Sequence, residues 1–181
     1  MKKTLVIHPQ DRSTDFLKPI YANIPNVTVI TGGKTQKEIN QLIDEHDRII
    51  MMGHGCPDGL FSIGRFPDSH GLVISNSNVP HLMNKENIGI WCNADGFFKP
   101  RNLPGFFSGM FISEVGEAWY CLRKDYPRKD VEESNDVFAQ ILGEHSTKDL
   151  NVIHEKVTNE YGKFAESSDI ARYNNNRLYI Q

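Results

Sequence analysis

The sequence predicts a single three-layer α/β domain, in which helices cover both faces of a mainly parallel sheet of five or six strands. Short β-branched runs alternate with helical patterns through the first half of the chain, as they do in βαβ units. The length of 181 residues suits one domain of ordinary size, and no repeat or long linker divides it. We therefore interpret residues 1–181 as one domain, with a core over 1–123 and a helical C-terminal part over 124–181 that ends in a strand.

Four apolar, mostly β-branched runs are expected to form the core strands. They lie at 4–8, 27–31, 47–52, with its centre at 48–52, and 87–92. The third run leads into a loop over 53–59 that is too rich in glycine and proline to continue as a strand. A small hairpin is expected after it, with strands at 60–63 and 72–74, and 178–180 is expected to be the last strand of the domain.

Apolar residues spaced three or four apart predict the helices. The predicted ranges are 13–23, a helix that begins at the capping box of Thr35 and Glu38, 78–85, 108–123, 135–142 and 146–165. Gly143 is expected to end the helix that precedes it. The segment 97–107, rich in phenylalanine and proline, is expected to be a loop.

The charge balance and the N-terminus exclude several classes of protein. The chain has 20 basic and 23 acidic side chains, with a net charge of −3 and no basic block, so we expect no nucleic-acid partner. The N-terminal apolar run is too short for a signal peptide, and no run approaches the roughly 20 residues of a membrane helix. These features predict a cytoplasmic protein with no membrane partner.

No cofactor or metal is expected from the motifs. Gly32, Gly33, Lys34 and Thr35 resemble the end of a phosphate-binding loop, but Thr28 stands where that motif needs its first glycine. A capped helix start explains the segment better.

Two strand ends carry residues that suit nucleophilic catalysis. His54 follows the third core strand and Cys92 ends the fourth, and ligands of parallel sheets bind at the carboxyl ends of the strands. A histidine within hydrogen-bond reach converts a cysteine into a reactive thiolate. Gly55 removes a side chain beside His54, so the N–H groups of Gly55 and Cys92 are candidate oxyanion donors.

The His-Gly motif at 54–55 and the strand that ends in Cys92 resemble the caspase-like cysteine peptidases, the group that includes caspases, gingipains and clostripain. In that group the histidine precedes the cysteine by a few tens of residues. The segments 91–97 and 111–118 look most like gingipain-type domains, although the caspase signature Gln-Ala-Cys-x-Gly is absent. The resemblance implies a caspase-like fold and a peptidase of peptide or protein substrates, with His54 as general base and acid and Cys92 as the nucleophile of an acyl-enzyme.

The residues leave other interpretations open. Cys92 could be a small core residue, and the short C-terminal part favours a non-catalytic interaction module that kept the fold. A flavodoxin-like nucleotide-binding domain is a weaker alternative. His54, Cys56 and Cys92 could together bind zinc, although their spacing matches no closed zinc motif. Otherwise Cys56 is interpreted as a bystander and Cys121 as a packing residue, since an odd number of widely spaced cysteines argues against disulfides.

The same edge supplies candidate residues for a substrate pocket. His8 ends the first strand, where Asp11 and Ser13 either line the cleft or cap the next helix. Asp58, Asp95 and Glu114 are candidates for a pocket that prefers a basic or polar substrate side chain to aspartate. A buried aspartate carboxylate would need arginine donors, which these loops lack. Arg65 or Arg101 folding over the cleft is the rival arrangement. The oligomeric state is not indicated by the sequence.

Overall fold

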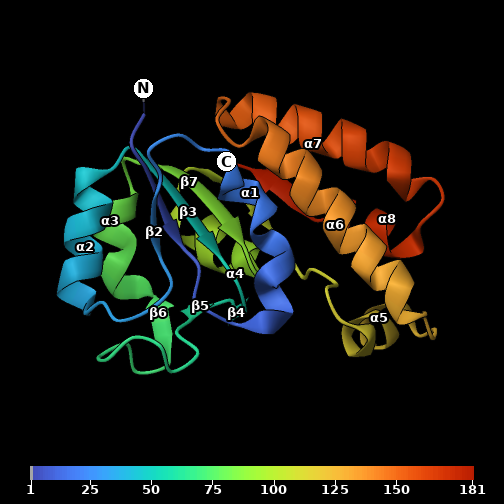
Figure 1. Ribbon diagram of the computed structural model, residues 1–181, viewed down its shortest axis with the longest axis horizontal. Coiled ribbons are helices and arrows are strands. Elements are labelled where there is room, and N and C mark those ends of the chain that lie inside the picture. Colours follow the sequence, from blue (N-terminus) through green and yellow to red (C-terminus); the bar gives the residue numbers. More distant parts are fainter. Residues whose placement is uncertain (1) are drawn as a thin grey trace.

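The computed structural model describes residues 2–181, which form a central six-stranded sheet flanked by helices (Figure 1). The strands lie in the order β2-β1-β3-β7-β8-β9. The first five are parallel, and the last is antiparallel to its neighbour. Their bounds are β1 (Thr4–Ile7), β2 (Thr28–Ile30), β3 (Arg48–Met52), β7 (Glu86–Ile90), β8 (Gly105–Ser108) and β9 (Leu178–Ile180). The expected mainly parallel sheet is confirmed.

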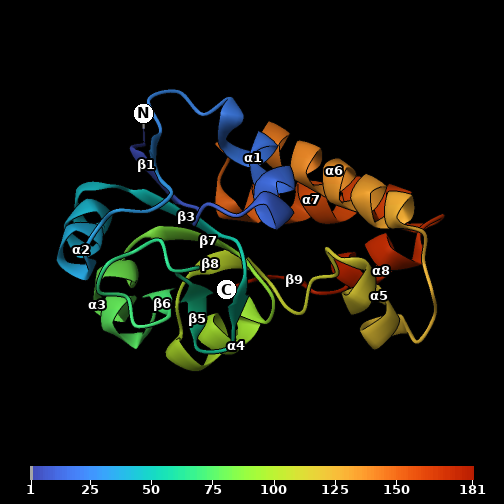
Figure 2. The same ribbon diagram turned by 60° about the horizontal axis from the view of Figure 1, so that its bottom comes forward.

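Alternate residues of the strands face two separate layers of helices. Val6 and Ile50 belong to the core beneath η1 (Arg12–Leu17), α1 (Pro19–Ala22), α6 (Arg128–His145) and α7 (Leu150–Ala165). Leu5 and Ile49 belong to the opposite core, beneath α2 (Gln36–Glu45), α3 (Val79–Leu82) and α4 (Ala94–Phe98). Figure 2 shows α6 and α7 on one side of the sheet and α3 and α4 on the other. The prediction of helices on both faces is therefore confirmed.

A second, three-stranded antiparallel sheet follows β3. Its strands are β4 (Gly55–Cys56), β5 (Gly59–Phe61) and β6 (Leu72–Ile74). The predicted hairpin corresponds to β5 and β6. The loop predicted over 53–59 is corrected in part, because Gly55 and Cys56 pair with Leu60 and Gly59 and so add a short strand to the hairpin.

Two segments in the N-terminal half that were predicted as single helices have a different local structure from the one predicted. The range 13–23 is a 3-10 turn, η1, followed by the short α1, and Pro19 lies at the junction because proline lacks the N–H that a continuing helix requires. The range 78–85 holds η2 (Asn76–Asn78) and α3. The capping box is confirmed, since the Glu38 N–H donates to the Thr35 hydroxyl oxygen at 3.3 Å and the Thr35 N–H donates to the Glu38 carboxylate at 2.9 Å.

The largest errors of the sequence prediction lie between residues 97 and 123. The predicted loop over 97–107 contains the end of α4, η3 (Lys99–Arg101) and most of β8. The predicted helix over 108–123 is only α5 (Val115–Leu122), because the segment before it is bound to distant parts of the chain. The Gly109 N–H donates to the Arg177 carbonyl, and the Ile112 N–H donates to the Asn174 side chain.

The first of the C-terminal helices is longer than predicted, the second begins later than predicted, at Leu150, and a third was missed. Helix α6 begins after Pro127 and continues through Gly143, where a β-carbon would lie 2.6 Å from the Pro19 carbonyl oxygen. Gly143 thus allows α6 to pack against α1 instead of ending the helix. Helix α7 is followed by α8 (Asp169–Asn175), which the sequence prediction lacked. Across residues 2–181, no helix is long and apolar enough to cross a membrane.

Candidate functional site

Strands β3 and β7 bring His54 and Cys92 to one edge of the sheet. The two strands pair in parallel with Met52 opposite Ile90, and the Gly53 N–H donates to the Ile90 carbonyl at 3.1 Å. His54 and Cys92 each lie two residues after the end of their strand. The expectation that both residues lie at the same edge is confirmed.

Both side chains line one small cavity of about 20 Å³, which has room for about one water molecule. Phe16 and Ser113 line this cavity and also a larger one of about 670 Å³ beside it. The larger cavity lies between the segment that follows β1, the segment that leads into α5, and helix α6. The residues that line it are Arg12, Ser13, Phe16, Ser113, Glu114, Val115, Gly116, Arg128, Val131, Glu132, Asn135 and Asp136.

The His54 ring is bound to the loop that follows β1. Its Nε2 lies 2.7 Å from the Ser13 hydroxyl and 3.7 Å from the Asp11 carboxylate. The Ser13 N–H and hydroxyl both donate to Asp11, at 3.0 and 3.1 Å, so the hydroxyl oxygen is free to accept from His54 Nε2. These bonds, that of the Ser13 N–H first, lower the pKa of Asp11. The loop therefore orients the ring and leaves Nδ1 as the basic atom of the neutral imidazole.

The Cys92 thiol is bound to a different part of the chain. Its Sγ donates to the Phe111 carbonyl at 3.4 Å and lies 3.6 Å from a Glu117 carboxylate oxygen. Burial raises the pKa of the thiol to about 12, and the negative charge of Glu117 adds to the rise. Within residues 2–181 no hydrogen bond joins Cys92 to His54. In this arrangement the cysteine is a protonated thiol, not a thiolate.

Glu117 also accepts hydrogen bonds from the segment that begins α5. Its other carboxylate oxygen accepts the Ser113 N–H at 2.7 Å, the Ser113 hydroxyl at 3.1 Å and the Glu114 N–H at 3.0 Å. A carboxylate is favourable at a helix N-terminus because the first N–H groups there have no partner within the helix. The same side chain thus fixes the start of α5 and holds the Cys92 thiol.

The candidate oxyanion donor Gly55 is explained by packing. A β-carbon at this position would lie 2.2 Å from the Trp91 ring. The Trp91 indole N–H donates to the Cys56 carbonyl at 3.0 Å, which fixes β4 against the end of β7. An oxyanion role for the Gly55 and Cys92 N–H groups stays a prediction.

Of the four candidate pocket residues, one lines the large cavity and three lie elsewhere. Glu114 lines the large cavity. His8 is 3% exposed and bonds to Thr14 and Tyr21, and burial lowers its pKa to about 4. Asp58 is exposed in the turn between β4 and β5, and Asp95 pairs with Lys99 at 3.7 Å. None of these last three is among the residues that line the two cavities.

The other cysteines and the rival arginines lie elsewhere. All three cysteines are free thiols, and Cys121 packs against an apolar cluster as expected. In the described part of the chain, Cys56 and Cys92 do not gather with His54 into a set of metal ligands. Arg65 donates to the Gln10 carbonyl and Arg101 donates to Asn76, and neither arginine lines the two cavities.

Sequence reasoning missed the contribution of α6 to this edge. Asn135 is 4% exposed, donates to the Ser113 carbonyl at 2.9 Å and has a buried side-chain oxygen without a partner in the described chain. It lies four residues after Val131 and three before Phe138, both of which are buried. A polar residue at a core position of an amphipathic helix is the signal that could have identified it.

Comparisons with known proteins assign no family to this arrangement. No protein-family model matches the chain, and no curated protein matches it. The fold and the site define an α/β protein with histidine and cysteine at the carboxyl edge of its parallel sheet.

Proposed function

We propose that the chain is a cysteine-dependent hydrolase, specifically a caspase-like peptidase with Cys92 as nucleophile and His54 as general base and acid. The observation that carries the proposal is the shared cavity: the parallel ends of β3 and β7 place both side chains on its wall. Ligands of open parallel sheets bind at this edge, next to the point where the strand order reverses. Here that point lies between β1 and β3.

The reaction uses the two side chains in sequence. His54 takes the thiol proton while the Cys92 sulfur attacks the carbonyl carbon of a peptide bond, and backbone N–H groups stabilise the oxyanion. The carbon–nitrogen bond then breaks as His54 gives its proton to the leaving amine. Water next attacks the thioester, with His54 accepting a proton from the water and returning it to the sulfur.

The thiol must change partner before this reaction begins. Its hydrogen is directed to Phe111 and Glu117, and its pKa is raised to about 12. A rotation about the Cα–Cβ bond would move the sulfur away from Glu117, and the small cavity beside it is shared with His54. We therefore propose that the structure represents a resting state and that substrate binding turns the sulfur toward the imidazole.

The large cavity is the proposed substrate pocket. Its volume of about 670 Å³ lies within the usual range of ligand pockets, roughly 300–1,000 Å³. Three carboxylates, from Glu114, Glu132 and Asp136, line it together with Arg12 and Arg128. The excess of carboxylates supports a peptide with a lysine or arginine side chain next to the scissile bond.

A non-catalytic interaction module is the second candidate function. It is favoured by the protonated state of the Cys92 thiol and by its hydrogen bond to Phe111. In this alternative the thiol is part of the packing between β7 and α5, and the large cavity binds a partner peptide without cleaving it.

A panel of fluorogenic peptides separates the two candidates. The peptidase should cleave after arginine or lysine, and Cys92→Ala or His54→Ala should lower kcat/KM by about a thousandfold or more. Cys121→Ala is the matched control and should retain the wild-type rate. Equal activity of Cys92→Ala and the wild type would contradict the peptidase, and cleavage after aspartate alone would contradict the basic preference.

Alkylation by iodoacetamide gives a second measurement, which does not depend on cleavage of the peptide. With a bound peptide, Cys92 of the peptidase should be labelled faster than Cys121, and His54→Ala should remove the difference. Slow labelling of both cysteines, together with no cleavage of any peptide, would favour the interaction module.

A further inference from the structure

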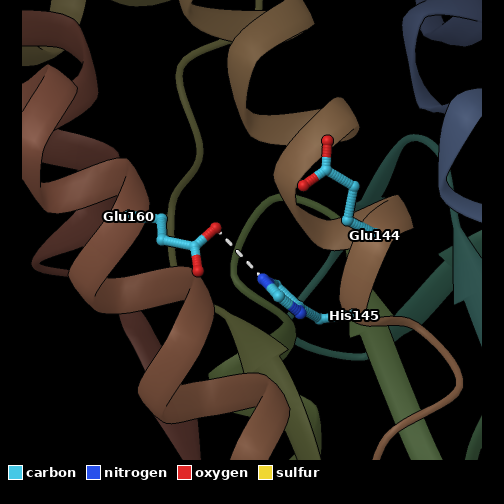
Figure 3. Close-up of side chains that lie close together, drawn as sticks. All are labelled: Glu144, His145 and Glu160. Atoms are coloured by element: carbon cyan, nitrogen blue, oxygen red, sulfur yellow. Dashed lines mark hydrogen bonds and ion pairs between the residues drawn. The ribbon is translucent and has the colours of Figure 1, made fainter.

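Helices α6 and α7 form an antiparallel pair whose adjoining ends lie on the far side of the domain from the His54 loop (Figure 1). His145 is the last residue of α6, and Glu160 lies on α7. Their side chains meet across the helix pair, with His145 Nε2 at 3.1 Å from a Glu160 carboxylate oxygen (Figure 3). Glu144 lies next to His145 on α6.

These three side chains are gathered closely enough to act as ligands. One ligand atom from each, an imidazole nitrogen or a carboxylate oxygen, lies within 4.8 Å of the other two. In the described part of the chain, this is the one such group of histidine, cysteine, aspartate and glutamate side chains. The ligands come from two helices that pack against each other, so their spacing is set by the core and not by a flexible loop.

We propose that Glu144, His145 and Glu160 bind one divalent transition-metal ion of the Zn²⁺ type between α6 and α7. Imidazole and carboxylate ligands suit Zn²⁺, and three protein ligands leave a fourth position for solvent. The two carboxylates balance the charge of the ion. The C-terminal end of an 18-residue helix adds negative potential at the same point.

The His145 ring binds the ion through the nitrogen that now contacts Glu160. The proton on Nε2 moves to Nδ1, so the imidazole stays neutral, and the ion takes the place of the proton between His145 and Glu160. Glu144 must give up only the weak bond that it accepts from Gln140, at 3.3 Å.

The proposal is tested first on the intact wild-type chain. One equivalent of Zn²⁺ is added to the metal-free protein, and X-ray absorption at the zinc edge reports the ligands. Nitrogen and oxygen neighbours at about 2.0–2.2 Å are expected. A sulfur neighbour at about 2.3 Å would assign the ion to a cysteine and overturn the proposal.

Variants then locate the ion by competition with a chromophoric chelator. His145→Asn, Glu160→Gln and Glu144→Gln should each weaken Zn²⁺ binding at least tenfold. His70→Asn and Glu155→Gln are the matched controls, since both residues lie outside the cluster and are exposed, and they should bind as the wild type does. Equal affinity of all five variants would overturn the proposal and leave a plain hydrogen bond between two helices.

Discussion

The two ends of strands β3 and β7 differ in how completely their polar groups are paired. At the start of the strands, Arg48 is 2% exposed and lies opposite Glu86. Its guanidinium donates twice to Glu86, at 3.0 and 2.6 Å, and also to the carbonyls of Ser146 and Lys148 in the connection between α6 and α7. At the other end, His54 and Cys92 bond to separate loops and face a cavity.

Within this one pair of strands, the fully paired end stabilises the fold, and the end that faces the cavity carries the candidate reactive groups. A buried charge is tolerated only where its partners are complete, and such a network holds the chain in one arrangement. Side chains that face a cavity can exchange one partner for another, as a reaction or a ligand requires. Four predictions test the contrast.

The largest effect is expected at the paired end. Arg48→Met should lower the free energy of unfolding by about 3–5 kcal/mol, because it leaves two carbonyls without their donor and leaves Glu86 with Lys2 as its remaining partner. Urea unfolding measures the change. Arg172→Met is the matched control, since Arg172 pairs with Asp169 on the surface, and it should cost less than about 1 kcal/mol. Equal costs for the two variants would show that burial of Arg48 does not matter.

The carboxyl edge of the sheet, where His8 follows β1, should be the acid-sensitive edge. Burial lowers the pKa of His8 from 6.5 to about 4. Between these two pH values, His8 is protonated in the unfolded chain and neutral in the folded chain. Stability is therefore complete above pH 6.5 and falls as the pH drops toward 4, by about 3 kcal/mol in total. Unfolding measured from pH 7 to 4 should show a smaller slope for His8→Gln than for the wild type. An unchanged slope would mean that His8 is not the group responsible.

The next effect concerns the reactivity of Cys92. Glu117→Gln removes the negative charge that adds to the raised thiol pKa, and each unit of pKa is worth about tenfold in thiolate. Alkylation of Cys92 by iodoacetamide should accelerate roughly three- to tenfold, as measured by mass spectrometry with Cys56 as the internal reference. Glu114→Gln should leave the rate unchanged, since the thiol's hydrogen-bond partners are Phe111 and Glu117. A wild-type rate in Glu117→Gln would assign the raised pKa to burial alone.

The smallest effect on stability is expected for Lys2, an exposed second partner of Glu86. Lys2 pairs with Glu86 at 2.6 Å and with Asp149 at 3.0 Å, but its side chain is 44% exposed. Lys2→Ala should change the free energy of unfolding by less than about 1 kcal/mol, because water screens the pair. A cost close to that of Arg48→Met would contradict the role that we assign to burial.

Several features of this protein could be predicted from local sequence. The runs at β1, β2, β3 and β7 predict buried parallel strands because each is mostly apolar, with β-branched residues at its centre. The capping box of Thr35 and Glu38 predicts the start of α2, since both partners lie within four residues. The placement of His54 and Cys92 at one edge follows from parallel pairing alone.

Other features depend on residues that are distant in the chain. Strand β8 was missed because its four residues lie in a proline-rich segment, and they become a strand by pairing with Asn87 and its neighbours. The start of α5 depends on bonds from Gly109 and Ile112 to residues near the C-terminus. The passage of α6 through Gly143 depends on contact with Pro19.

The candidate site likewise has features that local sequence determines and features that depend on distant residues. The sequence by itself determined which residue types reach the carboxyl edge of the sheet, because strand ends and turns are local properties. Only the tertiary structure decided that the Cys92 thiol meets Phe111 and Glu117 while His54 meets Ser13. The physical reason is that hydrogen-bond partners and pKa values depend on burial and on charges brought together by packing, which no single stretch of sequence contains.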